Sequence, residues 1–584
     1  LSGHLPFAFN ASAQEVLVVG LASGVTAGSV ATHPVKRITV VEIEPAVGEA
    51  AREFSAFNNN VLDDPRLELI YDDGRHFLAV TGRKFDLIIS EPSNPWMSGP
   101  ARLFTREFFT LARRKLRKDG VFAQWVPLYG LGPRYFRSLL KTFLDVFPEA
   151  TAFRVAEGDL LLIGSDSPLQ ISLAGLERAF AAPSIREDLA RIGADSPGAL
   201  LAKWIGGKAT LLAVAGEDAE INTDDNGLVE FGAPSFLNQP TLLENLSLLK
   251  QGRRPAELES ILRLDSPNPK SAEILIDAAK AAIMDSNLEF AGEAAGILKM
   301  QNHLSAFHYV RGAILLAQGE NESARSAWRM VRPGNSVFVT AMLKLAELEL
   351  DSEPGADAAD ETLRQIPQAA GRNPFNFLRG RIALRRDEPD QALRAFRRIT
   401  SDDADSMTLE VLLYSYLATA RKGDREGSER FRQEIFNHTK RIRRAAERDQ
   451  GQIVIDRLLA VFSQHKTRWL KPAERAQLEE WLRTLLLEPL SRYYRGVSLL
   501  WSGKEKQASA ALRRAALALP APDPGSMIHY FLALSIQNNE PAGALKLLRA
   551  FADARAAEQK DNDWLDGDLE RLMAKLLSRL SSGR

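Results

Sequence analysis

Residues 85–96 read FDLIISEPSNPW, an apolar run that leads directly into a polar segment with two prolines. Apart from Asp86, the first five residues are apolar, as in a parallel strand covered on both faces. The prolines fix φ and restrict the residues before them, so Glu91 and Asn94 are held in a stiff frame. Because ligands of open α/β sheets bind beyond the carboxyl ends of strands, Glu91 is the leading candidate for catalysis.

Other short apolar runs predict further strands on both sides of this one. They lie at residues 16–19, 38–44, 67–71 and 121–126, with a strand pair joined by a tight turn at 151–163. Helix-compatible segments separate the single strands, as in successive βαβ units. Five such units closed by a hairpin favour an α/β fold with the doubly wound sheet of class I methyltransferases over the six-strand dinucleotide-binding form.

Glycines and acids stand where the first three strands end. Gly20 and Gly24 follow the first strand, Glu42 ends the second, and Asp73 with Gly74 closes the third. An ionised carboxylate at the end of the second strand can accept hydrogen bonds from both hydroxyls of a ribose. The alternative for Glu42 and Asp73 is that each is a solvated acid that caps the following helix.

With these motifs in order at the ends of strands one to four, residues 1–235 resemble the spermidine synthase-like (polyamine aminopropyltransferase) family. The resemblance implies decarboxylated S-adenosylmethionine, or S-adenosylmethionine, as co-substrate, a small-molecule amine as acceptor, and Glu91 as the base toward that amine. It also implies five donor-binding residues. These are Gly20, Gly24 and Glu42 toward the adenosyl-thioether and ribose groups, and Asp73 with Gly74 toward the adenine amino group.

The chain departs from the family pattern at two places. The family's glycine loop usually reads Gly-Gly-Gly-Asp-Gly-Gly, whereas residues 20–25 read GLASGV and lack the acid. Family members that are synthases carry two Asp after strand four, where this chain has Glu91 and neutral Asn94. A diammonium acceptor would lose one counter-charge at Asn94, which argues against authentic spermidine synthesis. Glu91 reaches one methylene further than Asp, which would suit a bulkier or differently placed acceptor.

Aromatic and polar residues near the ends of strands four and five are the candidates for acceptor binding. They are Asn94, Trp96, Gln124 and Tyr129, with Trp125 beside them, and Asp224 in the polar turn at 221–227. The aromatic rings could contact a cationic chain or the sulfonium, although core or lid packing explains each ring as well. The 221–227 turn, expected to precede a short β-like tail, is either a lid contact or a turn built by Asn and Asp side chains.

A chain of 584 residues is too long to form a single hydrophobic core, and changes in composition along it suggest four segments. Residues 1–165 are predicted to be the Rossmann-like adenosyl-binding core, and 166–235 a helical extension or lid of the same domain. A linker is expected at 236–270, where prolines lie among polar residues. Residues 271–584, rich in Ala, Leu and Arg, are predicted to be all α-helical.

A spaced pattern of small and large residues recurs in this last segment, at positions 0, 7, 12 and 16. The four occurrences are Gly312, Gly319, Ala324 and Trp328; Gly380, Asp387, Ala392 and Phe396; Gly496, Gly503, Ala508 and Leu512; and Leu532, Asn539, Ala544 and Leu548. Small residues at fixed positions let paired helices pack closely, and the pattern resembles tetratricopeptide repeats. We therefore expect a tetratricopeptide-like solenoid whose groove binds a protein or peptide.

Composition narrows the classes of partner and cofactor. With 74 basic and 75 acidic residues the net charge is −1, which gives no drive toward nucleic acid, and none is predicted. The chain has no cysteine, which excludes disulfides and thiolate chemistry, and its eight histidines show no metal-ligand spacing, so no metal is predicted. A homo-oligomer is left open.

No apolar run reaches the length of a membrane span, and the N-terminus lacks a signal pattern. We expect a cytoplasmic protein. The chain does not begin with Met, so it could also be the soluble part of a membrane-anchored protein.

Three functions remain open at this stage. The first is an aminopropyltransferase-like enzyme, and the second is a methyltransferase that uses S-adenosylmethionine on the same fold. The methyltransferase function stays open because Glu91 stands in place of Asp and because the glycine loop lacks its acid. The third is a non-catalytic scaffold in which the nucleotide fold senses a ligand. An NAD-binding fold is disfavoured because Gly20 and Gly24 lack the Gly-x-Gly-x-x-Gly spacing.

Overall fold

A computed structural model of the chain divides into two compact units, residues Leu1–Phe338 and Val339–Arg584. The described residues are 1–237, 239, 241–254, 257–263, 269–285, 287–352, 355–367, 372–399, 404–445, 505–517, 527–538, 540–557, 572–574 and 576–577. Within these, no helix is long and apolar enough to cross a membrane.

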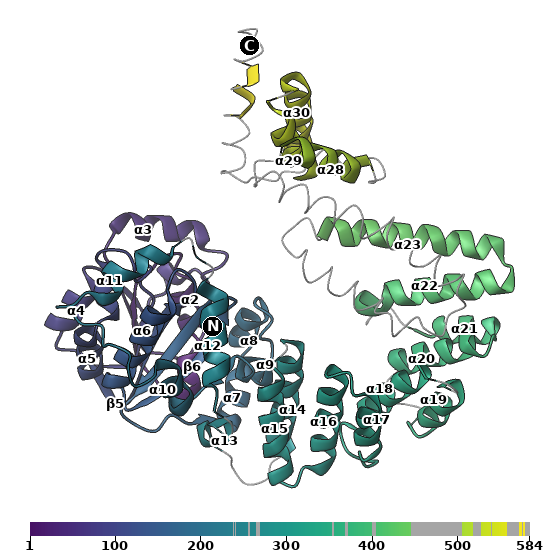
Figure 1. The fold of residues 1–584 in the computed structure, drawn as a ribbon, viewed down its shortest axis with the longest axis horizontal. Helices are drawn as coiled ribbons and strands as arrows, with labels where there is room; N and C mark the ends of the chain where they lie inside the picture. The colour runs from purple at the N-terminus through teal and green to yellow at the C-terminus, as the bar shows by residue number, and fades with distance from the viewer. Residues whose placement is uncertain are drawn as a thin grey trace. The chain divides into compact units, whose positions relative to one another are not determined.

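The first unit is built on an eight-stranded sheet with the order β3-β2-β1-β4-β5-β7-β6-β9. Helices lie around this sheet (Figure 1). The strands are β1 (Glu15–Val19), β2 (Arg37–Glu42), β3 (Leu67–Tyr71), β4 (Phe85–Ser90), β5 (Leu116–Pro127), β6 (Glu149–Ala156), β7 (Asp159–Ser165) and β9 (Trp204–Gly206). The first five strands pair in parallel, whereas β7 is antiparallel to both β5 and β6. This order confirms the predicted methyltransferase-type doubly wound sheet.

Helices connect and cover these strands. Those of the core are α1 (Leu5–Phe9), α2 (Val25–Ala31), α3 (Pro45–Ala50), α4 (Gly74–Val80), α5 (Arg106–Arg114) and α6 (Pro133–Val146). Between α5, α6 and β5 the core is a cluster of phenylalanines, in which Phe122 stacks on Phe147 with centroids 5.2 Å apart and meets Phe109 edge-on at 5.9 Å. Burial of such rings is the main contribution to the stability of this face.

Residues 166–235, predicted to be helical, contain both helices and strands. The helices are α7 (Leu173–Phe180), α8 (Pro183–Ala190), α9 (Pro197–Leu201), α10 (Lys208–Ala215) and α11 (Leu228–Gly232). Two strands interrupt them: β9 joins the sheet beside β6, and β8 (Ile171–Ser172) pairs with β10 (Leu262–Arg263).

The expected β-like tail after the 221–227 turn is wrong, because Leu228–Gly232 is helix α11. Gly227 has φ of +50°, and Asn226 Oδ1 accepts hydrogen bonds from Thr223 N–H at 2.9 Å and Leu228 N–H at 3.2 Å. These bonds start a helix where strand propensity alone favours extended chain.

The expected linker at 236–270 instead contains α12 (Thr241–Gly252) and α13 (Glu257–Ile261), and the first unit continues to Phe338. The reason is burial, since α12 packs on α6 and α10. Trp204 of β9 ties this region to the sheet: its Nε1–H donates to Thr151 Oγ1 at 2.8 Å, and Arg253 lies over its ring at 5.4 Å. The first unit ends with α14 (Pro269–Met284), α15 (Leu288–Met300), α16 (Leu304–Ala317) and α17 (Asn321–Arg329).

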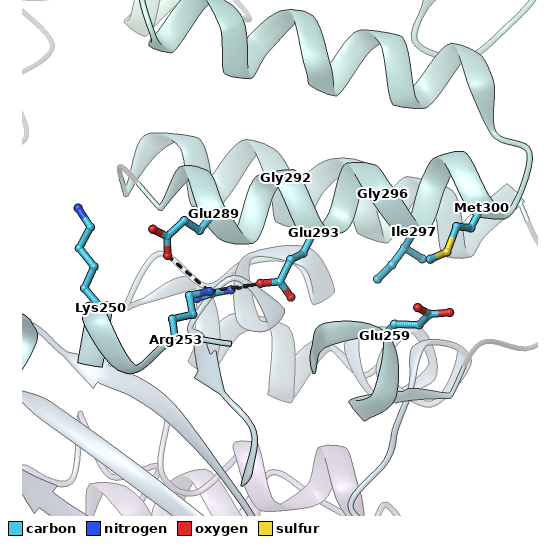
Figure 2. Close-up of a pocket in the computed structure, with 9 residues that line it drawn as sticks. All are labelled: Lys250, Arg253, Glu259, Glu289, Gly292, Glu293, Gly296, Ile297 and Met300. Atoms are coloured by element: carbon cyan, nitrogen blue, oxygen red, sulfur yellow. Dashed lines mark hydrogen bonds and ion pairs between the residues drawn. The ribbon is translucent and has the colours of Figure 1, made fainter. Parts of the chain in front are cut away.

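A cavity of about 630 Å³ lies between α12, α13 and α15 (Figure 2). Arg253 on its wall is already paired with Glu293 at 3.0 Å and Glu289 at 3.7 Å. None of the residues predicted to bind donor or acceptor lines this cavity.

The C-terminal region is largely helical. The described helices of the second unit are α18 (Phe338–Leu350), α19 (Gly355–Arg364), α20 (Arg372–Arg385), α21 (Pro389–Phe396), α22 (Ala404–Lys422), α23 (Arg425–Ala445), α28 (Glu505–Leu517), α29 (Met527–Ile536) and α30 (Pro541–Ala557).

Two occurrences of the predicted spacing are visible as helix pairs. A Cβ on Gly312 of α16 would lie 2.4 Å from Trp328 of α17, and one on Gly380 of α20 would lie 2.2 Å from Phe396 of α21. Close packing therefore requires glycine at the first position in both pairs. Gly496, Gly503 and Asn539 lie outside the described residues. A tetratricopeptide-like solenoid remains a prediction.

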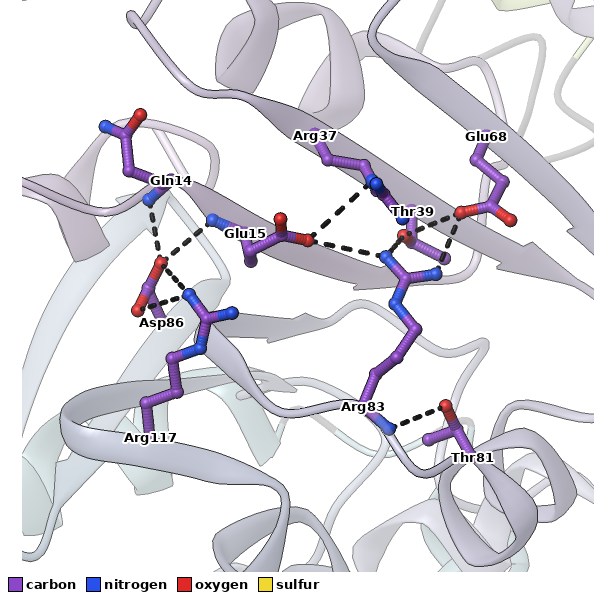
Figure 3. A network of polar contacts seen from close by, with 9 residues as sticks. All are labelled: Gln14, Glu15, Arg37, Thr39, Glu68, Thr81, Arg83, Asp86 and Arg117. Carbon is purple, nitrogen blue, oxygen red and sulfur yellow. Dashed lines mark hydrogen bonds and ion pairs between the residues drawn. The ribbon is translucent and has the colours of Figure 1, made fainter.

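The amino ends of the parallel strands are joined by a polar network (Figure 3). Asp86, the one polar residue near the start of β4, accepts hydrogen bonds from the backbone N–H groups of Gln14 at 2.8 Å and Glu15 at 2.9 Å. It also pairs with Arg117 at 3.1 Å. Its role is to align strand starts, at the end of the sheet opposite the predicted site.

Candidate functional site

The loop after β1 lies directly against the residue that follows β4. Gly20 has φ of +94°, and a Cβ at this position would lie 2.8 Å from the carbonyl oxygen of Glu91. Gly24, with φ of +77°, is the N-cap of α2. Both positions favour glycine, because a side chain would be strained at either and would also strike Glu91 at the first. The strand ends of β1 and β4 are therefore in close contact.

Glu42 is only 8% exposed and faces this loop. Its Oε2 accepts a hydrogen bond from Leu21 N–H at 2.8 Å, and its Oε1 accepts one from Glu44 N–H at 3.1 Å. The cap of α3 is Glu44, which accepts from Ala46 N–H at 3.0 Å. Glu42 is thus held at the end of β2 against the glycine loop and is not the helix cap.

Asp73, in contrast, does cap a helix. Its Oδ1 accepts hydrogen bonds from the N–H groups of Arg75 at 2.8 Å and His76 at 2.9 Å, at the start of α4. A Cβ on Gly74 would lie 2.5 Å from Val19 Cγ1, so glycine lets α4 begin against the end of β1. Capping and ligand binding are compatible at Asp73, since a carboxylate has a second oxygen.

Glu91 is half-buried at the end of β4. Its backbone N–H donates to Val19 O at 3.1 Å, which continues the β1–β4 pairing, and its Oε2 accepts a hydrogen bond from the Thr26 hydroxyl of α2. The carboxylate therefore lies beside the glycine loop and the helix that this loop starts. A base at this position is next to the predicted donor residues.

The residues predicted to bind the acceptor cluster around β4 and β5. Trp96 and Tyr129 meet edge to face with centroids 6.1 Å apart, and a Cβ on Gly130, which has φ of +64°, would lie 2.6 Å from Trp96 Cη2. Gln124 is fully buried and lies opposite Ser90 in the β4–β5 register. Tyr129 is 42% exposed, so this aromatic pair borders the surface.

Several buried polar atoms at this edge have no hydrogen-bond partner in the described protein. They are Ser90 Oγ, Asn94 Oδ1, Gln124 Oε1 and Asp159 Oδ1. A buried polar atom without a partner costs about 1–3 kcal/mol. A ligand that offers N–H groups would satisfy these oxygens.

Residues 2–156 match the family model described as spermine/spermidine synthase domain. The N-terminal part is a spermidine synthase-like domain. Over 154 residues the chain is 32% identical to a polyamine aminopropyltransferase of Clostridium perfringens (strain 13 / Type A). This alignment covers 26% of this chain and 54% of the relative. Over 120 residues it is 38% identical to polyamine aminopropyltransferase 1 of Pseudomonas aeruginosa. This alignment covers 20% of this chain and 42% of the relative. The chain thus spans about half the length of these curated relatives.

Among solved structures, a spermidine synthase in complex with the transition-state analogue AdoDATO aligns with 42% of this chain and 74% of its own, at 19% identity and a TM-score of 0.27. A spermidine synthase from Thermotoga maritima aligns with 42% and 72%, at 20% identity and a TM-score of 0.26.

Asp224 lies beside the predicted donor residue Gly74 and away from the predicted acceptor residues. Its carboxylate pairs with both terminal nitrogens of Arg75, one of them at 2.7 Å, and accepts from the Thr105 hydroxyl at 2.9 Å. The bond from Arg75 lowers the pKa of Asp224. Asp224 therefore fastens the 221–227 turn beside Gly74, and its contacts are not with the acceptor candidates.

Two further residues lie near the predicted acceptor residues and were not themselves predicted as site residues. Asp159 begins β7, and its pKa is raised by burial and by the nearby Glu91 carboxylate, against a hydrogen bond with Trp125. Asn245 of α12 is fully buried and donates from Nδ2 to the carbonyls of Leu128 and Leu131, both at 2.8 Å. Asn245 thereby holds the loop that carries Tyr129. Nothing in the local sequence marks this residue, because α12 lies in the expected linker.

The described residues contain no group of three or more His, Cys, Asp or Glu side chains arranged to hold a metal ion.

Proposed function

We propose that this chain is an aminopropyltransferase-like enzyme that transfers the aminopropyl group of decarboxylated S-adenosylmethionine to an amine. The observation that carries the proposal is the position of Glu91, a carboxylate at the end of β4 beside the glycine loop. Next to it, buried oxygens of Asn94 and Gln124 have no hydrogen-bond partner among the described residues. Oxygen acceptors grouped in this way suit a ligand that is rich in N–H groups.

The proposed reaction is an in-line displacement. The amine nitrogen forms a bond to the propyl carbon while the carbon–sulfur bond breaks, and the electron pair of that bond stays on sulfur, which leaves as the neutral thioether methylthioadenosine. The proton released by the nitrogen goes to Glu91. Because an alkyl amine has a pKa near that of Lys, about 10.4, a nearby carboxylate that accepts its proton assists the attack.

The donor side fits an adenosyl group. The Glu42 carboxylate is fixed by two backbone N–H groups, and each of its oxygens keeps a lone pair for a ribose hydroxyl. Gly20 and Gly24 leave the backbone of the loop uncovered by side chains, which permits close approach of the thioether group. On this basis we assign Gly20, Gly24, Glu42, Asp73 and Gly74 to the donor.

The test is mass spectrometry of the purified chain, incubated separately with decarboxylated S-adenosylmethionine and with S-adenosylmethionine, each with a panel of amines. We expect methylthioadenosine, and an amine that gains one propylamine unit, with the decarboxylated donor alone. S-adenosylhomocysteine in the second incubation would instead identify a methyltransferase. If neither product forms and neither donor binds, both enzyme functions are refuted, and a ligand-sensing scaffold is the remaining candidate.

We further propose that the C-terminal helices form tetratricopeptide-like repeats that bind a protein or peptide. Support comes from the shared spacing at Gly312 with Trp328 and at Gly380 with Phe396, where glycine allows close helix packing in both units. Cross-linking mass spectrometry should place a partner on residues 271–584, in the chain itself and equally in Glu91→Gln. Cross-links confined to residues 1–270 would contradict this assignment.

A further inference from the structure

The glycine loop after β1 is bound by a buried asparagine that lies outside the loop. Asn58 follows the short 3₁₀ helix η1 (Ala51–Phe54) and is only 1% exposed. Its Nδ2 donates to the carbonyl oxygen of Ser23, within the loop, at 3.0 Å and to that of Ala51, in η1, at 2.8 Å. One side chain therefore joins the loop to the helical segment that follows β2.

Two glycines pack directly against Asn58. A Cβ on Gly24 would lie 3.0 Å from Asn58 Nδ2, and a Cβ on Gly28 of α2 would lie 2.1 Å from Asn58 O. Gly28 N–H also donates to Gly24 O at 2.8 Å. Asn58 thus contacts the end of the loop with its side chain and the start of α2 with its backbone, and the missing side chains of the two glycines permit both contacts.

Two left-handed residues follow Asn58 and fix its position. Asn59 and Asn60 have φ of +56° and +52°, a region that asparagine enters more readily than most residues with a side chain. Asn59 Nδ2 donates to Gly28 O at 3.2 Å and to Asp188 Oδ1 of α8 at 3.1 Å. The three asparagines are therefore a turn, bonded to α2 and to α8, that keeps the amide of Asn58 against the loop.

The amide of Asn58 has a defined direction. Only its nitrogen can donate to two carbonyl oxygens. Its Oδ1 is buried and has no hydrogen-bond partner among the described residues. A buried oxygen without a partner is unfavourable, and a leucine of similar size would fill the same space without one. What asparagine contributes at this position is therefore its pair of hydrogen bonds, one of which is to the loop.

We infer that Asn58 is a positioning residue for the donor. By binding the Ser23 carbonyl it holds residues 20–24 in the conformation that accepts the adenosyl-thioether group. This inference rests on the proposed function and adds a residue outside the predicted site. Asn58 acts through the loop, and its matched counterpart is Asn245, which is also buried and donates twice to carbonyls of a loop, on the proposed acceptor side.

The test compares Asn58→Leu with Asn245→Leu in the full chain, because each variant removes two hydrogen bonds from a buried asparagine to backbone carbonyls. By calorimetry, Asn58→Leu should bind methylthioadenosine at least about tenfold more weakly than the unsubstituted chain. Binding by Asn245→Leu should stay within about threefold. In turnover, KM for the decarboxylated donor should rise in Asn58→Leu, whereas KM for the amine should change less than about threefold.

A second variant covers the case in which Asn58→Leu does not fold. Asn58→Ser fits the available space and keeps one hydrogen-bond donor, and it should bind methylthioadenosine at least about threefold more weakly. A general defect of the fold would weaken donor and amine alike in the variants of both asparagines. Loss of the donor alone at Asn58, and of the amine alone at Asn245, would be the signature of positioning.

The outcomes separate this inference from the proposed function. Unchanged methylthioadenosine binding in the Asn58 variants overturns the inference and leaves aminopropyl transfer intact, and an equal loss of donor and amine affinity overturns it as well. If no amine is converted, the proposed function fails, and calorimetry with methylthioadenosine still decides the inference. Weaker binding by the Asn58 variants but not by Asn245→Leu supports it, and absence of binding by the unsubstituted chain overturns it.

Discussion

The proposed donor side and the proposed acceptor side of the candidate site are built by different means. The donor side uses backbone geometry at the ends of β1, β2 and β3, where Gly20 and Gly74 permit contacts that any side chain would block. The acceptor side uses side chains from segments that are distant in sequence, including Trp96, Asp159 and Asn245. The order of the strands brings the donor-side residues together. The positions of the acceptor-side residues depend on how the β6–β7 hairpin and α12 pack against the sheet.

The two sides also differ in how their polar groups are satisfied. Glu42 on the donor side accepts two backbone hydrogen bonds. On the acceptor side, Asn94, Gln124 and Asp159 each have a buried oxygen without a partner in the described protein. The proposed donor side is thus preorganised by the fold, whereas the proposed acceptor side has polar groups without a partner among the described residues. Substitutions on the two sides should therefore have separable effects.

The largest effect is expected at Glu91, where the two sides meet. Glu91→Gln keeps the size of the side chain and the contact with Thr26, but it removes the base. Loss of a general base typically lowers turnover by about 10²–10⁴-fold. Single-turnover formation of methylthioadenosine should show this loss, while calorimetry with methylthioadenosine should show donor-side binding within about threefold of the unsubstituted chain. Retained turnover would remove Glu91 from the mechanism.

The next largest effect is expected at Gly20, on the donor side alone. In Gly20→Ala the new methyl group would lie 2.8 Å from the carbonyl oxygen of Glu91, at a φ of +94°. Strain of this kind costs of order 1–3 kcal/mol, so methylthioadenosine should bind about 10- to 100-fold more weakly by calorimetry. Gly82→Ala is the matched control, because nothing lies within 4 Å of a Cβ there. Equal binding by the two variants would show that the loop is not the donor site.

A smaller effect, confined to the acceptor side, is expected at Asn245. Asn245→Leu removes two hydrogen bonds to the loop of Tyr129 and leaves the carbonyls of Leu128 and Leu131 unpaired. KM for the amine should rise about 5- to 20-fold from the loosened loop, with donor affinity unchanged. Glu244→Gln, at an exposed neighbouring position of α12, should change neither quantity. A matching loss of donor affinity would mean that the two sides are not independent.

The donor side could be predicted because its signals are local. A glycine turn after an apolar run, and an acid at the end of the next strand, identify Gly20 and Glu42 without knowledge of distant contacts. The hairpin was predicted for the same reason. Asp159 was visible only as a turn residue, since nothing in its neighbourhood reveals that Glu91 is close. The role of Asn245 could not be predicted from the sequence, because the residues it binds are more than 100 positions away in the chain.

Two parts of the fold were missed for related reasons. The three residues Trp204–Gly206 are too few to show an alternating pattern, and pairing with β6 stabilises them as β9. The run at 228–231 has the composition of a strand, but Asn226 Oδ1 accepts a hydrogen bond from Leu228 N–H where helix α11 begins. The secondary structure of a short segment is determined by pairing with distant strands and by hydrogen bonds to side chains. That of a long segment is determined by its hydrophobic periodicity.

The smallest effect should appear on the donor side as the pH is lowered. His4 and His33 are buried beside α2, with His33 Nε2 at 2.9 Å from His4 Nδ1 and His4 Nε2 at 2.8 Å from Asp188 of α8. Burial, and then the neighbouring His4, lower the pKa of His33 to about 3. Ser29 of α2 also donates to Asp188 at 2.6 Å, so the network fastens α8 to the helix that carries Thr26.

The sign of the pH effect follows from these pKa values. Because His33 takes up a proton less readily in the folded state, its contribution to stability is complete above the unfolded pKa of about 6.5 and falls as the pH drops toward 3. Between pH 6.5 and 5 the free energy of unfolding should fall by at most about 2 kcal/mol through His33. Hydrogen exchange, corrected for intrinsic rates, should show weaker protection of α2 and α8 at pH 5 than at pH 7, and a smaller change in His33→Gln. Protection should hold in α12, which supports the acceptor side. A uniform loss across α2 and α12 would instead mean that the two sides open as one cooperative unit.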